Sequence, residues 1–411
     1  MATVDVDLGV NSSNTYSIAG KQLKFNAEDD IKPYLEDLGN RKELKKLDFS
    51  GNTLGIEASK ALSETILQHK DTLVEVDFSD IYTGRLNTEI PKSLGFLLPA
   101  LLKLPNLKLI NLSDNAFGLQ TIDPIEDFIS KAISIEHLIL SNNGMGPFAG
   151  SRIGSSLFKL YVAKKEANKS SLKTFICGRN RLENGSINYL SIGLRNHKDL
   201  STVKLYQNGI RPAGISKLVS QGLSHSKVLK ILDLQDNTIT LSGAEAIAQS
   251  LSKWDKLSEL NLNDSLLNPK GSLVLVNALN EKPKETLKIL KLQFNELEQD
   301  SLEALTFAIK DNLPNLQLLE LNGNRFEEDC DEIKKIISIF EDRGFGEIDE
   351  LDELEECDSE EEEEEEEDAE EDVLENDADL DQLEEDLIGK AERPDKDVDQ
   401  IANELAKAHI N

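Results

Sequence analysis

The segment Leu229-Lys-Ile-Leu-Asp-Leu-Gln-Asp-Asn-Thr-Ile239 defines the repeating unit of this 411-residue chain. It has the form L-x-x-L-x-L-x-x-N-x-I, which is the signature of a leucine-rich repeat. Leu232 and Leu234 alternate with Asp233, as expected of a short strand with one buried face. Asn237 stands where the strand turns away. Because its side-chain amide can hydrogen-bond the backbone of a neighbouring turn, we expect it to link one coil to the next.

The residues after this strand predict a helix. Ala244, Ile247, Ala248 and Leu251 follow the spacing i, i+3, i+4, i+7 and therefore share one apolar helical face. A single strand, turn and helix cannot bury its own apolar faces, so the core closes only when like units stack. The asparagine position recurs, mostly 28 to 30 residues apart, at Asn52, Ile81, Asn115, Asn143, Asn180, Asn208, Asn237, Ser265, Asn295 and Asn324. Long repeats of this kind predict an α/β leucine-rich-repeat solenoid, a ribonuclease-inhibitor-like horseshoe or crescent with parallel strands inside and helices outside.

The pattern divides the chain into four parts. Residues 1–35 are expected to form an N-terminal cap, 36–328 the leucine-rich repeats, 329–346 a C-terminal cap helix, and 347–411 an acidic and mostly disordered tail. Two repeats carry extra residues, Arg85–Leu94 and Val162–Ser171. The second insert is polar and rich in lysine, and we expect it to lengthen a helix.

The charge is concentrated at the C-terminal end. The net charge is −32, and residues 341–411 hold 34 acidic against five basic residues, which leaves 43 acidic and 40 basic residues before them. Within this region Leu380, Leu383, Leu387 and Ile388 recur at helical spacing. This group has two interpretations, a short hydrophobic export signal or a transient helix in the tail.

Several classes of function find no support in the sequence. There is no phosphate-binding G-x-x-x-x-G-K-[ST] loop and no H-E-x-x-H metal motif, and the five histidines lack ligand spacing. Basic residues form no stripe, so we expect no nucleic-acid partner. No apolar run reaches the length of about 20 residues that spans a membrane, and we expect no membrane association. Three scattered cysteines and no visible secretory signal indicate a reduced, intracellular protein.

The remaining candidate is the surface of the repeats. Outward strand positions are expected at Asp48, Asp77, Asn111, Ile139, Ile176, Lys204, Asp233, Asn261, Lys291 and Glu320, and the loop positions before each asparagine are Gly51, Asp80, Asp114, Asn142, Arg179, Gln207, Asp236, Asp264, Phe294 and Gly323. These columns are mixed in charge, and Phe294 and Tyr206 are expected to be exposed. A generic surface would favour more Lys and Glu and fewer Asn, Arg and aromatic residues, so the columns favour a binding surface. The loop Phe78–Arg85 breaks the asparagine series at Ile81 and places Tyr82 and Arg85 beside the first insert.

Several strings go beyond the repeat consensus. They are Phe78-Ser-Asp-Ile-Tyr-Thr-Gly-Arg85, Leu112-Ser-Asp-Asn-Ala-Phe-Gly118, Asn142-Asn-Gly-Met-Gly-Pro147, Ile176-Cys-Gly-Arg-Asn-Arg-Leu-Glu-Asn-Gly-Ser186, Gln207-Asn-Gly-Ile-Arg-Pro212, Leu232-Asp-Leu-Gln-Asp-Asn237 and Leu319-Glu-Leu-Asn-Gly-Asn-Arg-Phe326. In this order, and with the acidic tail, they resemble the Ran GTPase-activating proteins, most closely the fungal type. The resemblance covers roughly residues 15–372.

The resemblance implies stimulation of GTP hydrolysis by Ran without an inserted arginine finger. Asn142 would orient the GTPase's own catalytic Gln, and Arg85 would have a supporting role, holding its loop or contacting Ran. Partner-binding residues are expected among Asp80, Tyr82, Asp114, Asn143, Arg179, Arg181, Arg211, Asp236, Asp264 and Phe294. The chain would have no active site and no cofactor of its own, since the partner carries GTP and Mg²⁺.

The same resemblance implies a monomer that meets the GTP form of Ran, with accessory Ran-binding proteins as further partners, in a cytoplasmic and perinuclear location. Two other interpretations stay open on the sequence. One is a leucine-rich-repeat scaffold or inhibitor that only occludes its partner. The other is a histone-binding chaperone that acts through the acidic tail.

Overall fold

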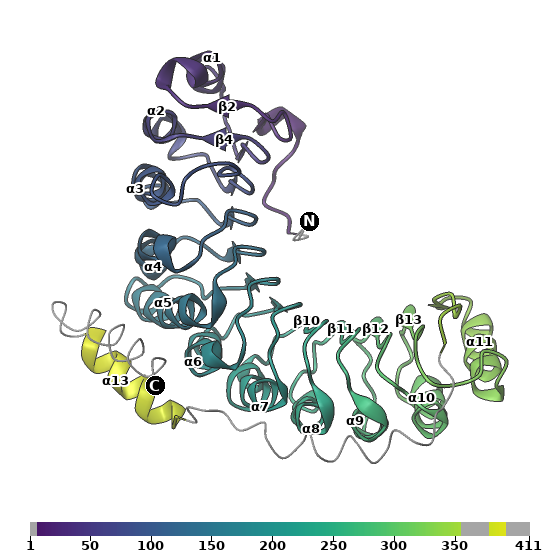
Figure 1. Cartoon of the computed structure of the whole chain (residues 1–411). Coiled ribbons are helices and arrows are strands. Elements are labelled where there is room, and N and C mark those ends of the chain that lie inside the picture. Colours follow the sequence, from purple (N-terminus) through teal and green to yellow (C-terminus); the bar gives the residue numbers. More distant parts are fainter. Residues whose placement is uncertain (1–5, 355–377, 392–411) are drawn as a thin grey trace.

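A computed structural model of the chain describes residues 6–354 and 378–391. Within them, twelve parallel strands form one continuous sheet in chain order, and helices return the chain outside it. Figure 1 shows the resulting crescent, with the strand tips along the inner side and the helices along the outer side. The predicted leucine-rich-repeat solenoid is therefore confirmed.

The strands of the sheet are β1 Thr15–Ser17, β3 Lys46–Asp48, β5 Glu75–Asp77, β6 Leu109–Asn111, β7 His137–Ile139, β8 Thr174–Ile176, β9 Thr202–Lys204, β10 Ile231–Asp233, β11 Glu259–Asn261, β12 Ile289–Lys291, β13 Leu318–Glu320 and β14 Glu347–Ile348. The pair β2 Lys24–Phe25 and β4 Thr53–Leu54 lies apart from it. The helices are α1 Glu28–Gly39, α2 Ile56–Ile66, α3 Ile90–Leu101, α4 Ile122–Lys131, α5 Gly146–Glu166, α6 Ile187–Asn196, α7 Pro212–Lys217, α8 Thr240–Leu251, α9 Asn268–Asn280, α10 Gln299–Asp311, α11 Asp331–Arg343 and α13 Leu380–Ala391.

The core fills the space between sheet and helices. The middle residue of each three-residue strand points into it; Leu138, Phe175 and Leu232, for example, are at most 2% exposed. The strands are in register, so these residues stack into one continuous column. Burial of such columns is the main favourable term in a solenoid, since each coil is covered only by its neighbours.

The asparagine series links the coils as predicted. Asn115, Asn143 and Asn180 are each about 1% exposed or less. The backbone N–H of Asn115 donates to Oδ1 of Asn143 (2.8 Å), and that of Asn143 donates to Oδ1 of Asn180 (2.9 Å). Their Nδ2 groups donate to backbone carbonyls, such as Asn143 to Leu140 (2.8 Å). Because each turn has buried backbone groups that need partners, these amides fix the loops that they follow. Ile81 and Ser265 take the asparagine position after β5 and β11.

The predicted domain boundaries need correction at both ends. The segment 1–35 does not end as a separate cap, because β1 joins the main sheet and α1 runs on to Gly39. At the other end β14 pairs with β13 beyond residue 346. The carboxylate of Asp349 accepts from the backbone N–H groups of Leu321 (2.7 Å) and Asn322 (3.0 Å), so the solenoid extends to about Leu354.

Part of the predicted tail also has a defined place. Residues 380–391 form α13, which packs against α6. The rest of the predicted disordered tail, 355–377 and 392–411, lies outside the described residues. The Lys-rich insert behaves as expected, since α5 is 21 residues long and extends to Glu166.

Candidate functional site

A row of loop residues follows the strands along one rim of the crescent. Each residue directly before the asparagine position of a coil, which Ile81 and Ser265 occupy in two coils, has a left-handed backbone, from φ 49° at Asp80 to φ 69° at Gly323. Asn, Asp and Gly tolerate this conformation, which explains most of the column by backbone needs alone. Arg179 (φ 57°) and Phe294 (φ 51°) are not favoured there. Gln207 has the same conformation (φ 54°), so the repeat imposes it whatever the residue type and the backbone alone assigns no role. Arg179 and Phe294 are candidates for partner contact because their side chains are exposed.

Asn142 stands near the middle of this rim, after β7. Its side chain is exposed, and its Nδ2 donates to Oδ1 of Asp114 on the preceding coil (2.7 Å). Its backbone N–H donates to the carbonyl of Gly178 on the next coil (2.8 Å). The loop is therefore held from both sides, and the amide is oriented by Asp114. Within residues 6–354 and 378–391 no group donates to Oδ1 of Asn142, so that oxygen can accept from a partner.

Arg85 lies in the first insert and is turned back onto the first coils. Its Nε donates to Oγ1 of Thr53 (2.8 Å), and its Nη1 donates to Oδ1 of Asn26 (2.8 Å). Its Nη2 donates to the carbonyls of Phe25 (3.0 Å) and Thr53 (3.1 Å). A guanidinium with four hydrogen bonds inside its own chain holds the loop in place. In this conformation it is not presented to a partner.

Tyr82 and Asn143 do not fit the expectation that they contact a partner. Tyr82 is 3% exposed, its hydroxyl is 2.7 Å from Oγ of Ser93, and burial raises the pKa of the phenol well above its usual value. Asn143 is 1% exposed and serves the coil-to-coil links described above. The repeat places the Asn143 side chain under the turn, whereas packing of the loop after β5 against α3 places the Tyr82 ring in the core.

The exposed rim carries charge in zones. Asp80 and Asp114 lie on one side of Asn142, and Arg179, Arg181 and Arg211 lie exposed on the coils that follow. In the described part of the chain none of these three arginines is in an ion pair, so their charge is available to a partner.

The next two rim carboxylates, Asp236 and Asp264, lie on neighbouring coils. Burial, and then the charge of Asp236, raise the pKa of Asp264 above its usual value. The second of these two causes indicates that the carboxylates of Asp236 and Asp264 lie close enough to repel each other. Phe294 continues the rim and is 39% exposed. Its ring lies over the next coil, where a Cβ on Gly323 would come within 2.1 Å of it.

The inner face behind Asn142 holds an apolar cluster that the sequence reasoning missed. Ile139 and Ile176 on β7 and β8 were expected to face outward, yet they are 3% and 0% exposed. Leu109 on β6, which is 6% exposed, packs with them. Leu8 of the N-terminal arm and Tyr206 pack against them. The covering arm crosses the inner face from β1, which repeat periodicity cannot predict.

Tyr206 ties this cluster to the rim. Its hydroxyl donates to Oγ of Ser141 (3.2 Å), the residue directly before Asn142. Its ring lies against Gly178, whose carbonyl accepts from the backbone N–H of Asn142. In the sequence, glycine at 178 is the signal for this contact, since any side chain there would collide with the Tyr206 ring. Tyr206, which follows β9, therefore supports the Asn142 loop from two coils further along the chain.

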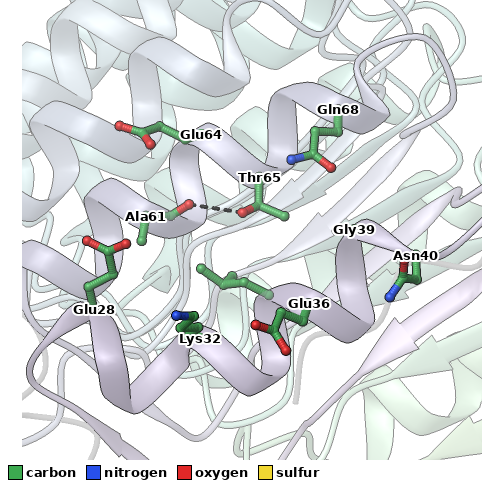
Figure 2. Close-up of a pocket in the computed structure, with 10 residues that line it drawn as sticks. Glu28, Lys32, Glu36, Gly39, Asn40, Ala61, Glu64, Thr65 and Gln68 are labelled. Atoms are coloured by element: carbon green, nitrogen blue, oxygen red, sulfur yellow. Dashed lines mark hydrogen bonds between the residues drawn. The ribbon is translucent and has the colours of Figure 1, made fainter.

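A hollow lies on the opposite, helical side of the crescent and is not part of the rim. Figure 2 shows it between α1 and α2. Its lining residues are Glu28, Lys32, Leu35, Glu36, Gly39, Asn40, Ala61, Glu64, Thr65 and Gln68. It is open and contains no histidine or cysteine. Across residues 6–354 and 378–391 no three His, Cys, Asp or Glu side chains gather as a metal site would require. None of the helices in those ranges is long and apolar enough to cross a membrane.

Comparisons with known proteins agree with the fold and extend it. Residues 225–248 match the family model described as Leucine Rich repeat. The chain is 52% identical to Ran GTPase-activating protein 1 of Saccharomyces cerevisiae over 349 residues, which cover 83% of this chain and 86% of the yeast protein. It is 31% identical to the Ran GTPase-activating protein of Drosophila melanogaster, with coverage of 78% and 54%. It is 41% identical to Ran GTPase-activating protein 2 of Caenorhabditis elegans, with coverage of 49% and 21%. The chain therefore belongs to the Ran GTPase-activating protein family.

Proposed function

We propose that this chain stimulates GTP hydrolysis by Ran, and that it does so by presenting Asn142 to the GTPase's own catalytic Gln. In small GTPases that Gln positions the attacking water. A side-chain amide both donates and accepts hydrogen bonds, so Asn142 can hold the Gln amide in the orientation that the water requires. The activator then supplies positioning, while the reacting groups, GTP and Mg²⁺ belong to the partner.

The contrast between Asn142 and Arg85 carries the proposal. The amide of Asn142 is exposed, oriented by Asp114 (2.7 Å) and left with an open acceptor. The guanidinium of Arg85 is half-buried and tied to Thr53, Asn26 and Phe25 by four hydrogen bonds. An inserted arginine would need a free and extended side chain. The arrangement favours a supporting role for Arg85 in holding its loop.

The charged zones of the rim suit a partner with the opposite order of charges. The exposed Arg179, Arg181 and Arg211 would meet acidic groups of the GTP form of Ran, and the flanking rim carboxylates would meet basic groups. Phe294 adds an apolar contact at the end of the row. We propose that the chain acts as a monomer, without a cofactor of its own, in the cytoplasm and near the nuclear envelope. Accessory Ran-binding proteins are proposed as further partners.

Single-turnover hydrolysis tests the function. Ran loaded with GTP is mixed with catalytic amounts of the full chain, and released phosphate is followed; a small GTPase of another family serves as the control substrate. We expect an acceleration of at least about 10³-fold on Ran, which is the lower range for GTPase activators, and none on the control GTPase. Binding to Ran without acceleration would leave only a scaffold or inhibitor. Capture of histones by the tail, again without acceleration, would favour the chaperone.

A further inference from the structure

Helix α13 lies against the outer side of the crescent, beside α5 and α6 (Figure 1). It comes from the acidic C-terminal region, roughly 190 residues later in the chain than the helices it touches. A 12-residue helix with four acidic side chains and little intrinsic stability is marginal alone in water. Its position must therefore come from the surface on which it rests.

The contact has an apolar centre. Leu380 and Leu387 are 2% and 7% exposed and pack with Phe158 and Ile192. Leu383, between them, is half-buried in the same cluster, and Tyr161, Val162 and Tyr189 complete its wall. Leu380, Leu383 and Leu387 follow i, i+3, i+7 and so face one way. Ile388 does not belong to this face and is 42% exposed.

The contact also has a charged edge. Arg195 of α6 donates from Nε to Oε2 of Glu384 (2.8 Å) and from Nη2 to Oδ1 of Asp381 (2.8 Å). Lys217 of α7 donates from Nζ to the carbonyl of Ala378 (2.7 Å), just before the helix. The Arg195 and Glu384 side chains are only 14% and 20% exposed. Charge-assisted hydrogen bonds at a partly buried edge are stronger than surface ion pairs and fix the direction of the helix.

We propose that the face formed by α5 and α6 is a docking site for an acidic amphipathic helix, and that α13 is its occupant within the same chain. An apolar face of leucines and an acidic edge are both needed for the fit. Because α13 belongs to the same chain, the contact is intramolecular, and a weak contact is enough for occupancy.

The docked helix withholds its leucines from other proteins. Of the four apolar residues that resemble an export signal, Leu380, Leu383 and Leu387 face the solenoid and only Ile388 faces outward. A receptor that reads leucines at helical spacing therefore requires α13 to leave α6 first. The docking site controls access to this segment.

Hydrogen exchange on the full chain tests the docking directly. We expect the amides of residues 384–391 to be protected in the wild type, because a helix this short exchanges freely when it is not held. Leu387→Ser should remove the protection, and Ile388→Ser is the matched control that should keep it. Leu387→Ser lies outside the solenoid, so its effect cannot come from unfolding of the repeats.

The charged edge provides a second and independent variant pair. Arg195→Glu should raise the exchange rates in α13 about tenfold or more, since it replaces the charge-assisted hydrogen bonds to Asp381 and Glu384 with repulsion. Arg195→Glu combined with Glu384→Arg should restore much of the protection. Unprotected α13 amides in the wild type, equal effects of the serine variants at 387 and 388, or no effect of Arg195→Glu would each overturn the proposal.

Discussion

Replacing Arg85 by Ala distinguishes a role in holding its own loop from a role as an arginine finger. The side chain makes four hydrogen bonds to Thr53, Asn26 and Phe25. Water can replace the bond at the exposed Asn26, so the two bonds to backbone carbonyls and the one to the Thr53 hydroxyl dominate. Because the donor is charged and the group is half-buried, their loss should cost about 2–3 kcal/mol of local stability.

The assay is native-state hydrogen exchange at the first coils. The N–H of Gly55 donates to the Phe25 carbonyl (2.7 Å), which Arg85 also contacts, so this amide reports local opening. A loss of about 2–3 kcal/mol makes its exchange roughly 30- to 150-fold faster. Arg85→Lys is the matched control: a single ammonium cannot reproduce the planar fork, so it should recover only part of the protection.

The same variants are then compared in GTP hydrolysis on Ran. If Arg85 only holds its loop, the maximal single-turnover rate of Arg85→Ala should stay within about threefold of the wild type at a temperature where the chain is folded. An arginine finger would instead cost about 10³- to 10⁵-fold. A loss of that size with unchanged exchange at Gly55 would refute the loop-holding role of Arg85.

Three further predictions concern the scaffold behind the rim. Asn180→Ala should lower the free energy of unfolding by about 3 kcal/mol, measured by chemical denaturation. The change leaves the buried N–H of Asn143 and the carbonyls of Leu140 and Gly178 without the hydrogen bonds that the Asn180 side chain makes. Gly178→Ala should cost about 1–3 kcal/mol, since its Cβ would come within 2.4 Å of the Tyr206 ring, and a Tyr206→Ala background should remove most of that cost; additive effects would contradict the contact. Burial lowers the pKa of His197 to about 4, below its value of about 6.5 in the unfolded chain, so the stability present above pH 6.5 should be lost as the pH falls toward 4. His197→Asn should flatten this part of the pH profile, and an unchanged slope would contradict it.

Repeat periodicity predicts the solenoid well because each coil repeats one local rule. The spacing of apolar residues predicts the inward positions of Leu138 and Leu232. The spacing of amide residues predicts the linking positions of Asn143 and Asn180. The same rule predicts the left-handed rim position of Asn142, since it precedes a linking asparagine. What the side chain does there requires the geometry of Asp114 on the neighbouring coil.

The repeat pattern does not predict contacts between segments that are far apart in the sequence. The N-terminal arm that brings Leu8 onto Ile139, and the tail helix that brings Leu387 onto Ile192, join parts of the chain that share no repeat register. Tyr82 was misplaced for a related reason. The loop after β5 folds this aromatic ring into the core, and only the packing of α3 reveals this. Long-range packing decides these positions, and local pattern carries no trace of it.

Whether Asn142 orients the catalytic Gln of the partner is decided by single-turnover GTP hydrolysis on Ran at saturating concentrations of wild type, Asn142→Ala and Gln207→Ala. Gln207 has the same left-handed rim position two coils away (φ 54°) and is also exposed, so it is the matched control. Affinity is measured separately with Ran bound to a non-hydrolysable GTP analogue. We expect Asn142→Ala to slow hydrolysis about 100-fold or more with little change in affinity, while Gln207→Ala keeps the wild-type rate. A normal rate at saturation for Asn142→Ala, with only the affinity reduced, would contradict this role of Asn142.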